Sequence, residues 1–223
     1  MTYAPVMEIA RLYRDVQRSF VDLVAGLDDG QWELPSPCTP EWTVRDVLSH
    51  VAGVSIDIVE GNVEGAATDP WTAAQVERWR HTPVDEVIER WNAAIGPAAD
   101  GVDAFGQPLP IFDCHTHEHD VRTAIGRPGN RDSEAMQVIV DSLLQADVGR
   151  PLTIDCTDGR SVENAGAGAP LRLSGVTGFD VARSRLGRRS RGQVCGWEWS
   201  EPVGDEVLAA WFRFGPAPHD VVE

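Results

Sequence analysis

The sequence predicts a mainly α protein, with a helical N-terminal domain followed by a smaller mixed α+β domain. Two observations support this fold class. Apolar residues recur at three- and four-residue steps through most of the first 148 positions, which is the spacing of amphipathic helices. From Arg150 onward, short extended segments alternate with turn residues. We therefore expect one domain over residues 1–149 and a second over residues 150–223.

Capping and breaker residues mark several helix ends in the first domain. Thr43 is suited to cap a helix, and Asp46 follows three residues later, as in a capping box. Pro83 divides a long apolar pattern, and Gly126 and Pro128 end the next one. The expected helices are 4–26, one that begins at Thr43, 71–98 with its break at Pro83, 111–125 and 134–148, with turns over 96–110.

The second domain combines strands with helices. Residues 151–156 and 171–173 have strand character, and Asp158-Gly159 forms a turn after the first of them. Residues 176–196 are expected to form a helix, and a shorter one is expected near 204–213.

Charge and composition exclude several classes of partner. The net charge is −16, with 35 acidic and 19 basic residues, which disfavours binding to nucleic acid or anionic lipid. No apolar run approaches the ~20 residues of a membrane span, and no signal-peptide pattern is present. The four cysteines are far apart and form no CxxC pair. We expect a cytoplasmic protein with reduced thiols, as a monomer or homodimer.

Three of the six histidines fall in residues 113–120, which gives two interpretations of that segment. One is an H-x-H motif at the end of a strand in a metal-dependent barrel. Such a barrel needs about 250 residues, and fewer than half of the chain's 223 residues follow His117. The other is a helix. In a helix Asp113 and His117 share the apolar face, whereas His115 and His119 are expected on the polar, solvated face.

A carboxylate and a histidine one turn apart, directed into a helical bundle, form half of a metal site. His50 lies at the edge of the apolar stripe of another helix and completes the set. We therefore expect a divalent metal held by His50, Asp113 and His117. Two simpler alternatives remain open from the pattern alone, namely a hydrogen-bonded structural histidine and an Asp–His pair on a helix surface.

Other polar residues have weaker support. Asp120 and Asp46 are candidates to contact and orient the ligand histidines, although helix capping also explains Asp46. Arg188 and Arg189 are candidates to bind an anionic substrate or cofactor, with a structural role as the alternative.

Several stretches of the chain resemble a known family. These are Pro37 to Gly53, the segment His117 to Pro128 with the pattern H-x-x-D-x-R-x-A-x-G-R-P, the segment Phe179 to Trp199 containing Gly-Arg-Arg-Ser, and the ending Phe214-Gly215-Pro216. Together they resemble the mycothiol-dependent maleylpyruvate isomerase family of the DinB-like metalloprotein superfamily.

The resemblance implies a four-helix bundle with a bound divalent metal, with zinc expected. The family's ligands are a histidine on the second helix and a Glu-x-x-x-His pair on a later helix, which correspond here to His50, Asp113 and His117. Asp113 stands where the family usually has glutamate.

The resemblance also implies a function. It is that of a metal-dependent, mycothiol-using isomerase or S-transferase that acts on a small electrophilic substrate, with a metal-activated thiolate as the nucleophile. Two alternatives stay open: a non-catalytic metal-binding or stress-related binding module on the same fold, and a metal-dependent hydrolase that activates water. Thiol-dependent turnover distinguishes the first function from the other two.

Overall fold

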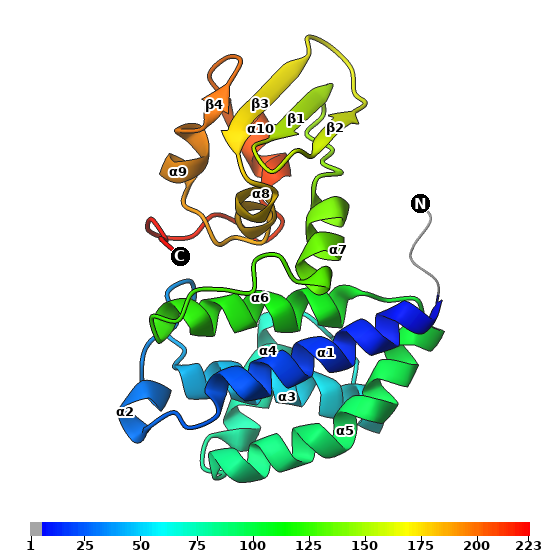
Figure 1. Cartoon of the computed structure of the whole chain (residues 1–223), viewed down its shortest axis with the longest axis vertical. Helices are drawn as coiled ribbons and strands as arrows, with labels where there is room; N and C mark the ends of the chain where they lie inside the picture. The colour runs from blue at the N-terminus through cyan, green and yellow to red at the C-terminus, as the bar shows by residue number, and fades with distance from the viewer. Residues whose placement is uncertain (1–5) are drawn as a thin grey trace. The chain divides into compact units, whose positions relative to one another are not determined.

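The computed structural model describes residues 6–223 and divides into two compact units, Met1–Gly129 and Asn130–Glu223 (Figure 1). The sequence places the boundary near residue 150, and the structural division falls earlier. The two boundaries differ because helix α7 (Glu134–Leu143) belongs to the second unit, where it packs against α8 (Gly178–Arg185). An apolar face explains this grouping, since Ile139, Val140 and Leu143 of α7 are all buried.

The N-terminal unit is a four-helix bundle with two short additional helices. The bundle helices are α1 (Val6–Val24), α3 (Val44–Glu60), α5 (Val84–Ala104) and α6 (Leu109–Ala124). Both α1 and α3 pack against both α5 and α6, which closes the bundle around one core (Figure 1). The short helices are α2 (Asp29–Trp32) and α4 (Asp69–Trp79), and α4 packs against α3.

Helix α3 begins where the sequence predicts. The side chain of Thr43 accepts a hydrogen bond from the backbone N–H of Asp46, and the Asp46 carboxylate accepts one from the backbone N–H of Thr43. This reciprocal pair is a capping box, with Asp in place of the usual Glu. The helix ends at Gly61, whose φ of 74° is the left-handed conformation that favours glycine.

Helix α5 extends further than the sequence predicts. Turns were expected over residues 96–110, yet α5 continues to Ala104 with Pro97 inside it. Burial explains the continuation, since Ala98, Ala99 and Val102 are buried and their packing outweighs the missing N–H of Pro97. The short helix α2 was also not predicted, and a capping box between Asp28 and Gln31 begins it.

A buried polar contact lies inside the bundle core. The hydroxyl groups of Tyr13 and Ser55 are hydrogen-bonded at 2.8 Å, and the indole N–H of Trp91 donates to Ser55 Oγ at 2.9 Å. These three side chains come from α1, α3 and α5, so one hydroxyl joins three helices. The polar groups of both large aromatic residues are thereby satisfied away from water.

The C-terminal unit is built on a four-stranded sheet with the order β2-β1-β3-β4. The strands are β1 (Leu152–Cys156), β2 (Ser161–Asn164), β3 (Leu171–Val176) and β4 (Glu198–Trp199). β1 pairs antiparallel with β2 and parallel with β3, and β3 pairs antiparallel with β4. The mixed α+β character expected for this part is confirmed, and β2 and β4 add to the two predicted strands.

The helix expected over residues 176–196 is two helices, α8 and α9 (Arg191–Cys195). Gly187 lies between them with a φ of 80°, which an α-helix does not accommodate. The last helix, α10 (Asp205–Trp211), matches the short helix predicted near 204–213. Among the described residues, no helix combines the length and the apolar character that crossing a membrane requires.

Candidate metal centre

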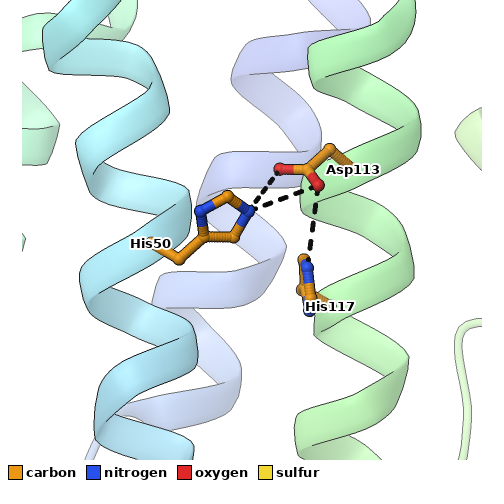
Figure 2. Close-up of side chains that lie close together, drawn as sticks. All are labelled: His50, Asp113 and His117. Carbon is orange, nitrogen blue, oxygen red and sulfur yellow. Dashed lines mark hydrogen bonds and ion pairs between the residues drawn. The ribbon is translucent and has the colours of Figure 1, made fainter. Parts of the chain in front are cut away.

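Two helices of the bundle bring His50, Asp113 and His117 together (Figure 2). His50 comes from α3, and Asp113 and His117 come from α6. The two imidazoles are buried, with 3% and 6% of each histidine exposed, whereas about a third of the Asp113 side chain is exposed. His50 Nε2 lies 3.3 Å from Asp113 Oδ2, and His117 Nε2 lies 3.6 Å from Asp113 Oδ1. The three predicted ligand residues therefore form one cluster.

Helical geometry explains the pairing on α6. Residues four apart lie one above the other on a helix, so Asp113 and His117 project from one face (Figure 2). The neighbouring helix α3 presents His50 toward that face because α3 and α6 pack directly against each other.

The cluster fits a divalent ion by both chemistry and spacing. Two imidazole nitrogens and a carboxylate oxygen are donors that zinc prefers. Ligand atoms held about 2.1 Å from a tetrahedral ion lie about 3.4 Å from one another. The ligand atoms of His50, Asp113 and His117 lie within 4.8 Å of one another, and two of the three pairs are near that tetrahedral separation.

Two residues beside the cluster were missed by the sequence analysis. The ring of Trp42 lies 5.2 Å from the ring of His50 and stacks at 5.9 Å on that of His117. Gln75, from α4, places Oε1 2.7 Å from His50 Nδ1. Trp42 lies in a proline-rich loop and Gln75 within a helical pattern, so neither had a sequence signal that pointed to the histidines.

Asp120 and Asp46, the two candidates to orient the ligand histidines, have different surroundings in the structure. Asp120 is fully buried, and its Oδ2 lies 3.1 Å from Nδ1 of His117. Asp46 caps α3, where its carboxylate accepts from both the backbone N–H and the hydroxyl of Thr43. Asp120 therefore lies beside His117, where an orienting role stays a prediction, and Asp46 has the capping role that its position also suggested.

The arginine candidates belong to the C-terminal unit. Arg189 is buried there and forms ion pairs with Asp180 and Glu223, at 2.8 and 2.7 Å. Arg188 donates to the backbone carbonyl of Leu186. Two carboxylates already compensate the charge of Arg189, which supports the structural alternative for that residue.

The expectation of a solvated face for His115 and His119 is wrong. Only 1% and 3% of these residues are exposed, and their rings lie 5.0 Å apart. His115 Nδ1 lies 3.0 Å from Glu118 Oε2, and Arg122 pairs with the same carboxylate at 2.7 Å. The helical period correctly groups these polar residues, but it does not tell whether water or protein covers them.

Comparison with known proteins assigns the family. Residues 13–127 match the family model of the mycothiol maleylpyruvate isomerase N-terminal domain. The chain belongs to this family. That range contains all three residues of the cluster, so the metal-ligand candidates of this family member lie within the matched domain.

Solved structures show the same fold as this member of the mycothiol maleylpyruvate isomerase family. One is a crystal structure of mycothiol-dependent maleylpyruvate isomerase, with a TM-score of 0.56 and 15% identity. Another is a histidine-to-alanine mutant of that enzyme, with a TM-score of 0.60 and 13% identity. Each comparison covers 92% of this chain and 98% of the other. No curated protein is significantly similar in sequence.

The cysteine nearest in sequence to the cluster is poorly suited to act as a nucleophile in this family member. Cys114 is buried, and burial, followed by the charges of Asp113 and Glu118, raises its thiol pKa well above the ordinary value. Burial also raises the pKa of Cys156 to about 11, and Asp158 adds to the shift. Both side chains are therefore neutral thiols near neutral pH.

Proposed function

We propose that the chain is a divalent-metal-dependent enzyme that uses mycothiol to isomerise, or to transfer a thiol to, a small electrophilic substrate. The main support is the convergence of His50, Asp113 and His117 from α3 and α6 in a domain of the mycothiol maleylpyruvate isomerase family. Zinc is the ion best matched to two imidazoles and one carboxylate.

Three protein ligands leave a tetrahedral site with one open position, which is the arrangement of a catalytic site. When bound there, the ion would supply a positive charge that stabilises the thiolate form of a low-molecular-weight thiol. The chain's own residues hold that arrangement. Asp120 lies against His117, and Trp42 covers one side of both imidazoles and limits access of water to them.

The nucleophilic thiol comes from the small molecule in this proposal, because the burial of Cys114 and Cys156 keeps both protonated. The thiolate adds to an electrophilic carbon of a carbon–carbon double bond in the substrate. The C–S bond forms as the π bond breaks, and the π electron pair moves onto the substrate's electron-withdrawing group. Rotation about the resulting single bond, followed by return of that electron pair and expulsion of the thiolate, gives the isomer. Protonation of the adduct by solvent without expulsion gives S-transfer.

The first experiment measures metal content and turnover together. Wild type, His50→Ala and His117→Ala are compared with His81→Ala, which changes an exposed histidine outside the cluster. We expect about one divalent ion per chain in wild type and His81→Ala, its loss in the other two, and turnover only with added mycothiol. Failure of wild type to take up any divalent ion would contradict metal dependence. Turnover without thiol would favour the hydrolase alternative.

A further inference from the structure

Gln75 links His50 to an ion pair between the buried Asp57 and the partly exposed Arg78. Gln75 is fully buried on α4, and its Oε1 lies 2.7 Å from His50 Nδ1. Its Nε2 donates to Asp57 Oδ2, also at 2.7 Å. Asp57 is fully buried on α3 and pairs with Arg78 at 2.7 Å. The side chains therefore form a continuous row from a ligand candidate to a guanidinium.

The chemistry of this row allows only one orientation of the Gln75 amide. A carboxylate paired with a guanidinium accepts hydrogen bonds and cannot donate them, so Asp57 must face the NH₂ group of Gln75. The amide oxygen of Gln75 then faces His50. That oxygen is an acceptor, so His50 Nδ1 must carry a hydrogen and donate it.

A neutral imidazole carries one N–H, so a hydrogen on Nδ1 leaves the lone pair on Nε2. Nε2 is the nitrogen that faces Asp113, at 3.3 Å from Oδ2 (Figure 2). The Asp113 carboxylate is itself an acceptor, so a lone pair on Nε2 is favourable there when a cation binds both groups. The row thus determines which nitrogen of His50 is available as a ligand. A histidine without such a partner populates both tautomers and presents the required lone pair only part of the time.

We propose that Gln75, oriented by the Asp57–Arg78 ion pair, is a positioning residue that holds His50 in the Nδ1–H tautomer and presents Nε2 to the metal. This inference rests on the proposed metal site for its function. In the metal-free wild type the Asp113 carboxylate competes for a hydrogen on Nε2, so the tautomer set by Gln75 is read in Asp113→Ala, where that carboxylate is absent. The side-chain hydrogen bonds of Gln75 join it to His50 and Asp57, so it acts on the cluster through His50.

The first test is the tautomer of His50 in metal-free Asp113→Ala protein, read from ¹⁵N chemical shifts and two-bond proton–nitrogen correlations in mildly alkaline buffer. The spectrum of the same protein with His50→Ala assigns the signals. We expect the Nδ1–H tautomer in Asp113→Ala and its loss or mixing when Gln75→Leu is added, because that change keeps the side-chain volume and removes the acceptor. An Nε2–H tautomer in Asp113→Ala, or an unchanged tautomer when Gln75→Leu is added, would overturn the proposal.

The second test is zinc affinity, measured by competition with a chelator. Loss of a group that orients a ligand histidine typically lowers metal affinity by about 10–100-fold, and we expect that loss in Gln75→Leu. The matched control is Gln17→Leu, since Gln17 is buried in the same bundle but donates to Asn92. An equal loss of affinity in both variants would indicate general destabilisation and overturn the positioning role.

Asp57→Asn provides an independent variant if Gln75→Leu folds poorly. An asparagine amide both donates and accepts, so Gln75 loses the constraint on its orientation while the volume stays the same. Added to Asp113→Ala, it is expected to give mixed tautomers of His50, and an unchanged tautomer would contradict the proposal. On its own, Asp57→Asn is expected to lower zinc affinity.

The tautomer and the metal site can fail separately. If Asp113→Ala has the Nδ1–H tautomer and Gln75→Leu removes it, yet wild type binds no metal, positioning is supported and metal dependence fails.

Discussion

Gly53 of α3 lies directly against Gln75 of α4, and a Cβ atom at Gly53 would stand 2.8 Å from both Cβ and Cγ of Gln75. Real Cβ contacts are not that short, so only glycine lets the two helices approach this closely. The same approach brings the amide of Gln75 to His50. The absence of a side chain at Gly53 thus allows Gln75 to reach His50, one of the metal-ligand candidates.

Gly53→Ala is expected to displace α4 and to weaken zinc binding by about tenfold, through the Gln75–His50 contact. Overpacking is expected to lower the free energy of unfolding by about 1–3 kcal/mol, partly offset by the better helix propensity of alanine. Chelator competition and urea denaturation measure the two effects. Gly101→Ala is the control, because Gly101 also lies in α5 and a Cβ there would make only an ordinary contact of 3.5 Å with Ile58, so this variant should become more stable by up to about 1 kcal/mol.

Asp113→Asn is expected to lower zinc affinity by more than tenfold, since it removes the only negative charge among the three ligand candidates. Because about a third of the side chain is exposed, the variant should retain its helicity and lose less than about 1 kcal/mol of stability. Isothermal titration with zinc and circular dichroism check the two parts. An exposed change on α1, Asp22→Asn, should leave the affinity intact, and wild-type affinity in Asp113→Asn would rule out the carboxylate as a ligand.

Trp42 should report metal binding through its fluorescence. Its ring lies 5.2 Å from the ring of His50, so a paramagnetic ion such as Co²⁺ at the cluster would quench its emission. The chain has eight tryptophans, and we expect partial quenching in wild type and much weaker quenching in Trp42→Phe. Zn²⁺, which has a closed shell, is the control ion. Equal quenching by Co²⁺ in both proteins would place the ion elsewhere.

Ser55→Ala is expected to destabilise the bundle by about 1–3 kcal/mol, because Tyr13 and Trp91 would each lose their partner in a buried site. Tyr13→Phe should cost less, about 0.5–1.5 kcal/mol, since the contact between Ser55 and Trp91 remains. Urea denaturation followed by circular dichroism gives both values. The decisive result is which variant loses more free energy of unfolding. A larger loss in Tyr13→Phe than in Ser55→Ala would contradict the role of Ser55.

Alkylation should distinguish the cysteines. We expect iodoacetamide to modify exposed Cys195 and to leave buried Cys114 unmodified in the folded protein. Cys156, whose pKa burial raises to about 11, should react faster only as the pH rises toward that value, because the thiolate is the reactive form. Mass spectrometry of peptides over a pH series gives the ranking. Rapid modification of Cys114 at neutral pH would weaken the argument for an external thiol.

The three ligand candidates could be predicted from the sequence because all of them lie on helices, whose geometry is set by local spacing. The i,i+4 spacing places Asp113 and His117 on one face, and the capping box at Thr43 fixes where the helix of His50 begins. Gln75 could not be found in this way. Its contact with His50 depends on how α4 packs against α3, and that packing depends in turn on the space at Gly53.

Two other sequence predictions, the end of α5 and the exposure of one face of α6, were wrong because tertiary packing outweighed the local sequence signals. A glycine–proline pair at positions 96 and 97 indicated a turn, but the buried residues beyond it continue α5 to Ala104. The polar face of α6 was predicted to be exposed to solvent, but its residues His115 and His119 are buried. Periodicity identifies the faces of a helix, and only tertiary structure shows what covers each face.

The separation of the ligand candidates along the chain would make a bound metal selective for the folded bundle. His50 and Asp113 lie 63 positions apart, so an unfolded chain offers an ion only the local Asp113–His117 pair. An ion that binds the folded bundle alone stabilises it by about 2.7 kcal/mol at a free concentration one hundred times Kd. No such donor group lies among the described residues of the C-terminal unit. Added zinc would then raise the melting temperature of the bundle and leave that of the C-terminal unit unchanged.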